Sequence, residues 1–118
     1  MSKDDLVYAG HMLDMSRKAV ALMRGKDRAA YDADETLRLA LAHLVQVIGE
    51  AARRVQREFR EIHSHIPWSD IVGMRHKIVH DYMDVEEDVL WSVVTSDLPT
   101  LIRDLGPIIP SEPDEGGS

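Results

Sequence analysis

Five side chains that can hold a phosphate or move a proton lie within eight consecutive residues of this sequence: Arg75, His76, Lys77, His80 and Tyr82. A histidine titrates near neutral pH, so it can accept or donate a proton during a reaction. An arginine carries a permanent charge on a planar fork that matches two oxygens of a phosphate. These residue types in one short segment therefore indicate acid–base chemistry on a phosphate-containing substrate.

The spacing of these residues limits how they could meet. Arg75 and His80 are five residues apart, which is roughly 140° around a regular α-helix, so they cannot share a helix face. They could act on one substrate if the helix breaks between them. They could also do so in a symmetric dimer, in which both copies supply Arg75 and His80 to one cleft. His76 and His80 are four residues apart and do share a face.

Each residue of the segment also has a simpler interpretation. His76 and His80 could bind a metal ion together with Asp84, although two imidazoles alone make an incomplete site. His80 could be an ordinary histidine at a helix end, where the helix dipole favours a cation. Tyr82 could pack against the protein with its hydroxyl in water.

The other basic residues are open to two interpretations as well. Arg75 could form a surface ion pair with Asp70 or Asp81. The densest basic cluster of the chain could guide a nucleic acid, but interleaved glutamates favour a solvated helix face. The cluster comprises Arg53, Arg54, Arg57 and Arg60, and the glutamates are Glu50, Glu58 and Glu61. Glu50 could also belong to a cleft with the histidine segment, and the sequence does not decide this.

The pattern of apolar residues predicts the elements that must position these side chains. Helical spacing predicts four helices, over residues 4–24, 34–60, 67–80 and 85–105, with a polar loop over 25–33. Gly73 could interrupt the third helix, and Pro99 should kink the fourth or make it restart after Asp97. The predicted fold is all-α: an antiparallel four- to five-helix up-and-down bundle over residues 1–106, with a mobile polar tail over 107–118.

The second predicted helix has an apolar surface wider than one core face requires. Its main stripe is widened by further apolar residues at positions 40, 45, 47 and 52. Either a partner chain covers the excess, or the helix is central and buried on two sides. Gly49 lies in mid-helix, where it costs about 1 kcal/mol relative to alanine. Close approach of another helix would explain its presence.

Composition and charge exclude several classes of protein. The 118-residue chain has no cysteine, which excludes disulfide scaffolds, thiolate nucleophiles and iron–sulfur clusters. It has no apolar run long enough to span a membrane, and its first residues are too acidic for a signal peptide, so we expect a cytoplasmic protein. The net charge of −7 divides into +2 over residues 1–77 and −9 over 78–118. This distribution argues against a general nucleic-acid coat protein but allows a local basic site.

The segment Arg75-x4-His80-x-Tyr82 resembles the R-x4-H-x-Y signature of HepT-like toxins, which belong to the HEPN (higher eukaryotes and prokaryotes nucleotide-binding) superfamily. An R-x4-H pattern alone is weak. The resemblance extends, however, to several other stretches in the same order, and together they cover most of residues 37–105. These stretches are residues 48–52, 66–68, 73–75, 78–82 and 91–101.

The resemblance implies a homodimeric helical bundle that acts as a metal-independent endoribonuclease, without a cofactor, and is the toxin of a toxin–antitoxin pair. The antitoxin would be an MNT-type nucleotidyltransferase that transfers AMP to Tyr82. His80 would be the acid–base group, Arg75 would stabilise phosphate charge, and His76 would support the site. The expected products carry 2′,3′-cyclic phosphates, and DNA, which lacks the 2′-hydroxyl, should not be cut. The alternative is a non-catalytic helical dimer that binds a nucleotide or the nucleotidyltransferase.

Overall fold

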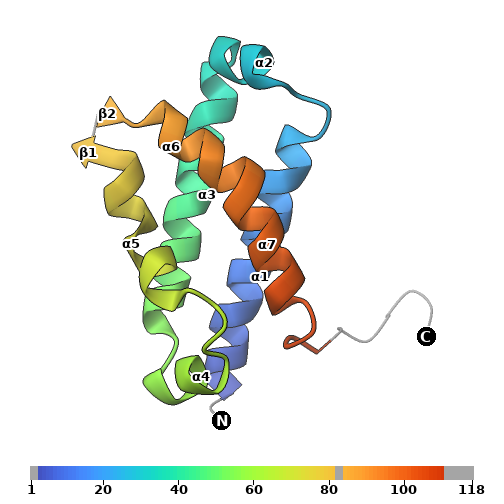
Figure 1. Ribbon diagram of the computed structural model, residues 1–118, viewed down its shortest axis with the longest axis vertical. Helices are drawn as coiled ribbons and strands as arrows, with labels where there is room; N and C mark the ends of the chain where they lie inside the picture. The colour runs from blue at the N-terminus through green and yellow to red at the C-terminus, as the bar shows by residue number, and fades with distance from the viewer. Residues whose placement is uncertain (1–2, 82–83, 111–118) are drawn as a thin grey trace.

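The computed structural model describes residues 3–81 and 84–110. In Figure 1, α1 and α5 run in one direction, while α3 and the α6–α7 segment return in the other. The helical fold class predicted from the sequence is confirmed. The elements in chain order are α1 (Lys3–Met23), α2 (Arg28–Ala33), α3 (Glu35–Arg54), α4 (Arg57–Ile62), α5 (Trp68–Ile78), β1 (Val79–Asp81), β2 (Asp84–Val85), α6 (Glu87–Ser92), the π-helix η1 (Val93–Asp97) and α7 (Leu98–Leu105).

Helix α3 is the central element of the fold. It packs against α1 along one side and against α5 along another, and α1 in turn packs against α7. Val45 and Ala52, two of the residues that widen its apolar stripe, are fully or almost fully buried by these contacts. The interpretation as a central helix buried on two sides therefore describes most of the stripe. Leu39 lies on α3 outside the predicted stripe and is 59% exposed.

Gly49 lies where α3 and α5 approach each other closely. A Cβ atom at this position would lie 3.1 Å from the carbonyl oxygen of Ile71 on α5. The expected close approach of a second helix is therefore confirmed.

We predict that Gly49→Leu lowers the free energy of unfolding by about 1–3 kcal/mol, because the added side chain must push α5 away from α3. Chemical denaturation of this variant and of the wild type measures the change. The matched control is Gly10→Ala in α1, where a Cβ would meet no described atom within 4 Å. There alanine should raise the free energy of unfolding by about 0.5–1 kcal/mol. Equal effects of the two substitutions would contradict the packing explanation.

The polar loop predicted over residues 25–33 contains a helix, α2, so that prediction was wrong for residues 28–33. The Asp27 side chain caps this helix by accepting a hydrogen bond from the backbone N–H of Ala30 at 2.9 Å. Tyr31 is fully buried, and its hydroxyl donates to Glu87 Oε2 at 2.9 Å. A short helix with one large buried side chain produces too little periodicity to be recognised in a sequence.

The helix predicted over residues 34–60 ends early, at Arg54, and a second helix begins at Arg57. Between them Val55 adopts an extended conformation. The buried carboxylate of Asp5 accepts a hydrogen bond from the backbone N–H of Gln56 at 2.9 Å, and Arg60 donates to the carbonyl of Ala52 at 2.8 Å. These contacts satisfy backbone groups that a continuous helix would have used internally.

The third predicted helix is shorter than expected at its C-terminal end. Gly73 does not interrupt α5, but the helix ends at Ile78 instead of continuing to residue 80. The chain then forms β1, which pairs with β2 in an antiparallel ribbon with Val79 opposite Val85. This small ribbon was not predicted, and its strands take up the end of the third predicted helix, the first residue of the fourth and part of the connection between them.

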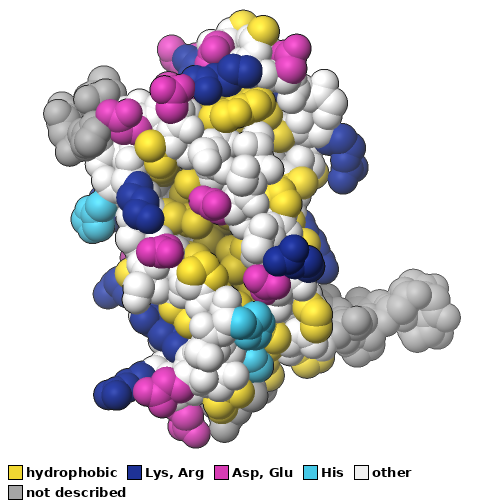
Figure 2. Space-filling view, viewed as in Figure 1, with side chains coloured by type: hydrophobic (Ala, Val, Ile, Leu, Met, Phe, Trp, Pro, Cys, Tyr) yellow, Lys and Arg dark blue, Asp and Glu magenta, His cyan; other side chains and the backbone are white. Residues whose placement is uncertain are grey.

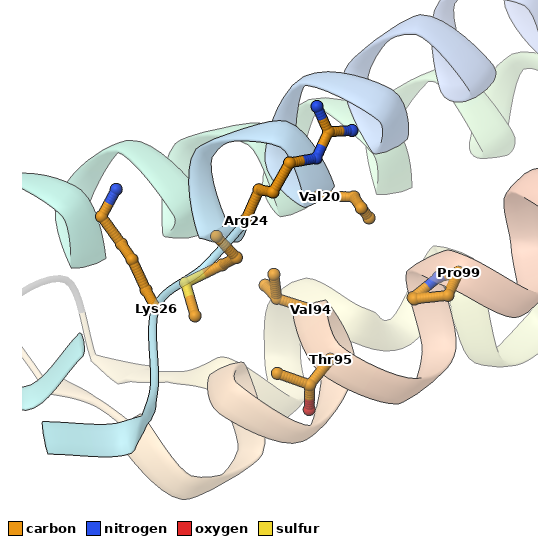
Figure 3. Close-up of a pocket in the computed structure, with 7 residues that line it drawn as sticks. Val20, Arg24, Lys26, Val94, Thr95 and Pro99 are labelled. Atoms are coloured by element: carbon orange, nitrogen blue, oxygen red, sulfur yellow. The ribbon is translucent and has the colours of Figure 1, made fainter. Parts of the chain in front are cut away.

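The fourth predicted helix contains a π-helical segment, η1, immediately before Pro99. The backbone N–H of Leu98 bonds to the carbonyl of Val93, five residues earlier, and α7 then begins at Leu98. The predicted restart after Asp97 is therefore confirmed. A small pocket of about 240 Å³ lies between this segment and the C-terminal end of α1, which also contact each other (Figure 3). The charged ends of Arg24 and Lys26 point away from its apolar wall.

Residues 107–110 follow α7. Ile108 and Ile109 are partly buried against the core, and the rest of the predicted tail, residues 111–118, lies outside the described residues. None of the helices in the described ranges is long and apolar enough to cross a membrane.

Candidate active site

A groove of about 520 Å³ lies between α3 and α5, and Gly49 is one of the residues that line it. It gathers polar side chains from two segments that are far apart in the sequence. Helix α3 contributes His43, Gln46, Glu50 and Arg53, and helix α5 contributes Ser69, Arg75 and His76. In this groove Arg75 and His76 of the predicted segment lie beside acidic, basic and imidazole side chains of α3.

Two of the predicted site residues line this groove. Arg75 and His76 are both exposed on α5. Among the described side chains no ion pair joins Arg75 to Asp70; Oδ1 of Asp70 lies 3.9 Å from Nζ of Lys77. The backbone of His80 belongs to β1, but its side chain and that of Asp81 lie outside the described part of the chain, as does Tyr82 entirely.

The backbone changes direction between Arg75 and His80. Helix α5 ends at Ile78, and Val79 is extended, with φ −127° and ψ 109°. The backbone N–H of Glu86 then donates to the carbonyl of Ile78 at 2.7 Å, which ties the chain after β2 to the end of the helix. A break of this kind is what the sequence required for Arg75 and His80 to serve one substrate within one chain.

Glu50 is the acidic residue of the groove, and arginines surround it. Its carboxylate accepts a hydrogen bond from Arg53 at 2.6 Å and lies 3.6 Å from Arg54. The hydrogen bond from Arg53, together with the charges of Arg53, Arg54 and Arg75, lowers the pKa of Glu50 below its ordinary value. One carboxylate thus faces three guanidinium groups, which leaves this end of the groove positively charged.

The basic cluster 53, 54, 57 and 60 does not form one patch. Arg53 lies in the groove, whereas Arg57 pairs with Glu61 at 2.9 Å on the exposed side of α4. Arg60 donates hydrogen bonds to the backbone carbonyls of Ala52 and Val55 at the end of α3. Of this cluster, Arg53 therefore lines the groove. Arg57 lies on a solvated helix face, as the interleaved glutamates had indicated.

The alternative metal site on His76, His80 and Asp84 depends on two side chains outside the described part of the chain. Among the side chains that are described, no three histidine, aspartate or glutamate residues lie close enough together to hold a metal ion.

The helical bundle thus carries a groove lined by arginine and histidine side chains, which are the groups that bind phosphate in proteins. Comparison with family models extends this: residues 12–108 match the family described as "Ribonuclease HepT-like". The chain belongs to this family, and its membership supports a ribonuclease activity.

Individual relatives agree with this assignment. "Putative RNase TTE0752" of Caldanaerobacter subterraneus subsp. tengcongensis is 30% identical over 105 residues, covering 89% of this chain and 94% of that protein. "Putative RNase MJ1380" of Methanocaldococcus jannaschii is 26% identical, covering 89% and 97%. "Probable ribonuclease HepT" of Thermococcus cleftensis is 35% identical over 68 residues, covering 58% and 62%. The comparison with solved structures gave no match.

We predict that Glu50→Gln tightens binding of RNA, because it removes the carboxylate that offsets the charges of Arg53, Arg54 and Arg75. The dissociation constant for an uncleavable 2′-O-methyl oligonucleotide should fall about two- to fivefold. Its dependence on salt concentration should become steeper. Fluorescence anisotropy measures both. Glu58→Gln, an exposed glutamate of α4 outside the groove, is the control and should bind like the wild type. Weaker binding by Glu50→Gln would mean that the carboxylate holds the arginines in a required position.

Proposed function

We propose that this protein is a metal-independent endoribonuclease that acts in the cytoplasm as the toxin of a toxin–antitoxin pair. The proposal depends most on the break between Arg75 and His80. Arg75 lines a positively charged groove, and the chain leaves the helix within five residues of it. Family membership supports the ribonuclease class, and the resemblance of the Arg75–Tyr82 segment to the HepT-like signature supports the finer assignment.

The proposed reaction uses groups that this chain supplies. The His80 imidazole takes the proton from a ribose 2′-hydroxyl as the 2′-oxygen attacks the adjacent phosphorus. The bond from phosphorus to the 5′-oxygen breaks, and that oxygen takes a proton from solvent, to which His80 later returns the proton it accepted. One product ends in a 2′,3′-cyclic phosphate and the other in a 5′-hydroxyl. Arg75 offsets the negative charge that develops on the phosphoryl oxygens during this step.

The groove polarity supports these roles. His76 is an exposed residue of the groove lining, next to Arg75 in the chain, and we assign it a supporting role. Arg53 and Arg54 add positive charge that attracts the RNA backbone. In this proposal two copies of the chain pair so that both motifs contribute to one cleft.

Regulation would act on Tyr82. Its hydroxyl oxygen attacks the α-phosphorus of ATP, held by an MNT-type nucleotidyltransferase antitoxin, and pyrophosphate leaves as the hydroxyl proton is lost. The product is an AMP group on the tyrosine two residues after His80. Because this group is bulky and anionic, it would compete with an RNA phosphate for the same arginine.

The test is cleavage of RNA by the wild-type protein in excess EDTA, after intact-mass measurement has established that Tyr82 carries no AMP. The matched substrate has a single 2′-deoxynucleotide at the cleaved position. We expect EDTA-resistant cleavage, cyclic-phosphate ends, and no cleavage at the deoxy position. An unmodified protein that binds RNA or the nucleotidyltransferase but cuts nothing would favour the non-catalytic dimer. Cleavage that EDTA abolishes would contradict metal independence.

A further inference from the structure

A second groove, of about 350 Å³, lies on the other side of α5 from the candidate active site. It separates α5 from η1 and α7, which make at most slight contact with α5. Figure 2 shows it as a hollow with an apolar floor between these elements. The floor is formed by Ile71 and Met74 of α5, Val93 of η1 and Leu101 of α7.

The rim of this groove is acidic. Asp70 of α5, Asp97 of η1 and Asp104 of α7 face it, with Lys77 as the basic residue of the lining. Lys77 lies 3.9 Å from Asp70, and Asp104 lies 3.4 Å from its exposed neighbour Arg103, whereas the side chain of Asp97 forms no ion pair or hydrogen bond within the described part of the chain. The lining therefore carries a net charge of −2 around an apolar centre.

We propose that this groove, the acidic groove, docks a basic amphipathic helix of another protein, with apolar side chains on the floor and Lys or Arg on the aspartates. An apolar floor is not covered by a nucleic acid backbone, and the rim carboxylates repel phosphate. The segment after residue 110 of this chain is also a poor occupant. It contains Glu112, Asp114 and Glu115, no basic residue and no large apolar side chain. A groove between helices is the usual receptor for an amphipathic helix.

Helix α5 thus separates two surfaces of opposite chemistry. Arg75 and His76 face the groove of the candidate active site between α3 and α5, the cationic groove, while Asp70 and Met74 face the acidic groove. The docking proposal does not depend on the ribonuclease proposal, because it uses none of the residues assigned to RNA cleavage.

The test uses a defined probe: a labelled helical peptide with a leucine face flanked by lysines, and a matched peptide with glutamates in place of the lysines. The variant is Asp97→Asn with Asp104→Asn, and the control is Asp14→Asn, an exposed aspartate of α1 outside the groove. Fluorescence anisotropy gives affinities. Thermal melting of each variant shows whether it is folded, and backbone amide shifts locate the bound peptide.

We expect the lysine peptide to bind, with amide shifts confined to α5, η1 and α7, and the double variant to bind it about fivefold more weakly than Asp14→Asn does. Added salt should weaken binding. Equal binding of the two peptides, equal affinities of the double variant and control, or shifts elsewhere on the surface would overturn the proposal. So would a loss of self-association in the double variant, measured by sedimentation, because a second copy of the chain would then occupy the groove.

Discussion

His80→Ala is expected to lower the rate constant for RNA cleavage by about 10²–10⁴, because a positioned proton-transfer group contributes on that scale. RNA binding should change little, since Arg53 and Arg75 still attract the phosphates. The measurement is single-turnover cleavage in excess EDTA, with the protein in saturating excess over the RNA. This design separates the chemical step from binding and from product release.

His65→Ala is the matched control for that experiment. His65 is exposed in the segment between α4 and α5, and it lines neither the cationic nor the acidic groove. Its replacement removes an imidazole of the same kind and should leave the rate unchanged. If His80→Ala cleaves RNA as fast as His65→Ala, then His80 is not the acid–base group.

Arg75→Ala is the substitution with the next largest expected effect, a loss of about 10²–10³ in the rate constant, which is the usual result of removing one stabilising donor at a developing charge. Arg75→Lys should fall between the alanine variant and the wild type, because it keeps the charge but loses the planar fork. The same single-turnover assay measures both variants.

Arg57→Ala provides the control, because Arg57 is exposed on α4 and pairs with Glu61 outside the cationic groove. It should cleave RNA at the wild-type rate.

A double variant, Arg75→Ala with His80→Ala, tests whether the two side chains act together. Residues that act as a unit are not additive, so the double loss should hardly exceed the larger single loss. Losses that multiply would mean that the two side chains act independently.

The long helices could be predicted because their periodicity is a local property of the sequence. Helix α1 begins and ends within one residue of its predicted bounds. The break after Arg54 could not be predicted, because its cause is distant. The carboxylate that accepts the Gln56 N–H belongs to Asp5, 51 residues earlier. No local pattern encodes such a contact.

The same distinction applies to the site. Residue type and spacing drew attention to Arg75 and His76, both of which line the groove, and indicated that Arg75 and His80 of one chain could serve one substrate only if the helix breaks between them. The contribution of α3 to the groove could not be predicted, since it depends on the approach of two helices at Gly49. Glu50 and Arg53 are three residues apart, and this spacing is the signal that could have placed a charged pair on one face of α3.

The π-helical segment before Pro99 behaves as if one residue had been inserted into a regular helix. Because one wide turn takes up this extra residue, deleting one residue from Val93–Asp97 would restore regular α-helical bonding and leave the buried Leu101 and Leu105 facing the core. Deleting one residue from the regular part of α7 before Leu101 would instead rotate everything after it by roughly 100° and turn both leucines away from the core. Natural length variation of one residue should therefore be tolerated in the π-helical segment and in the connections between helices, and not in α7.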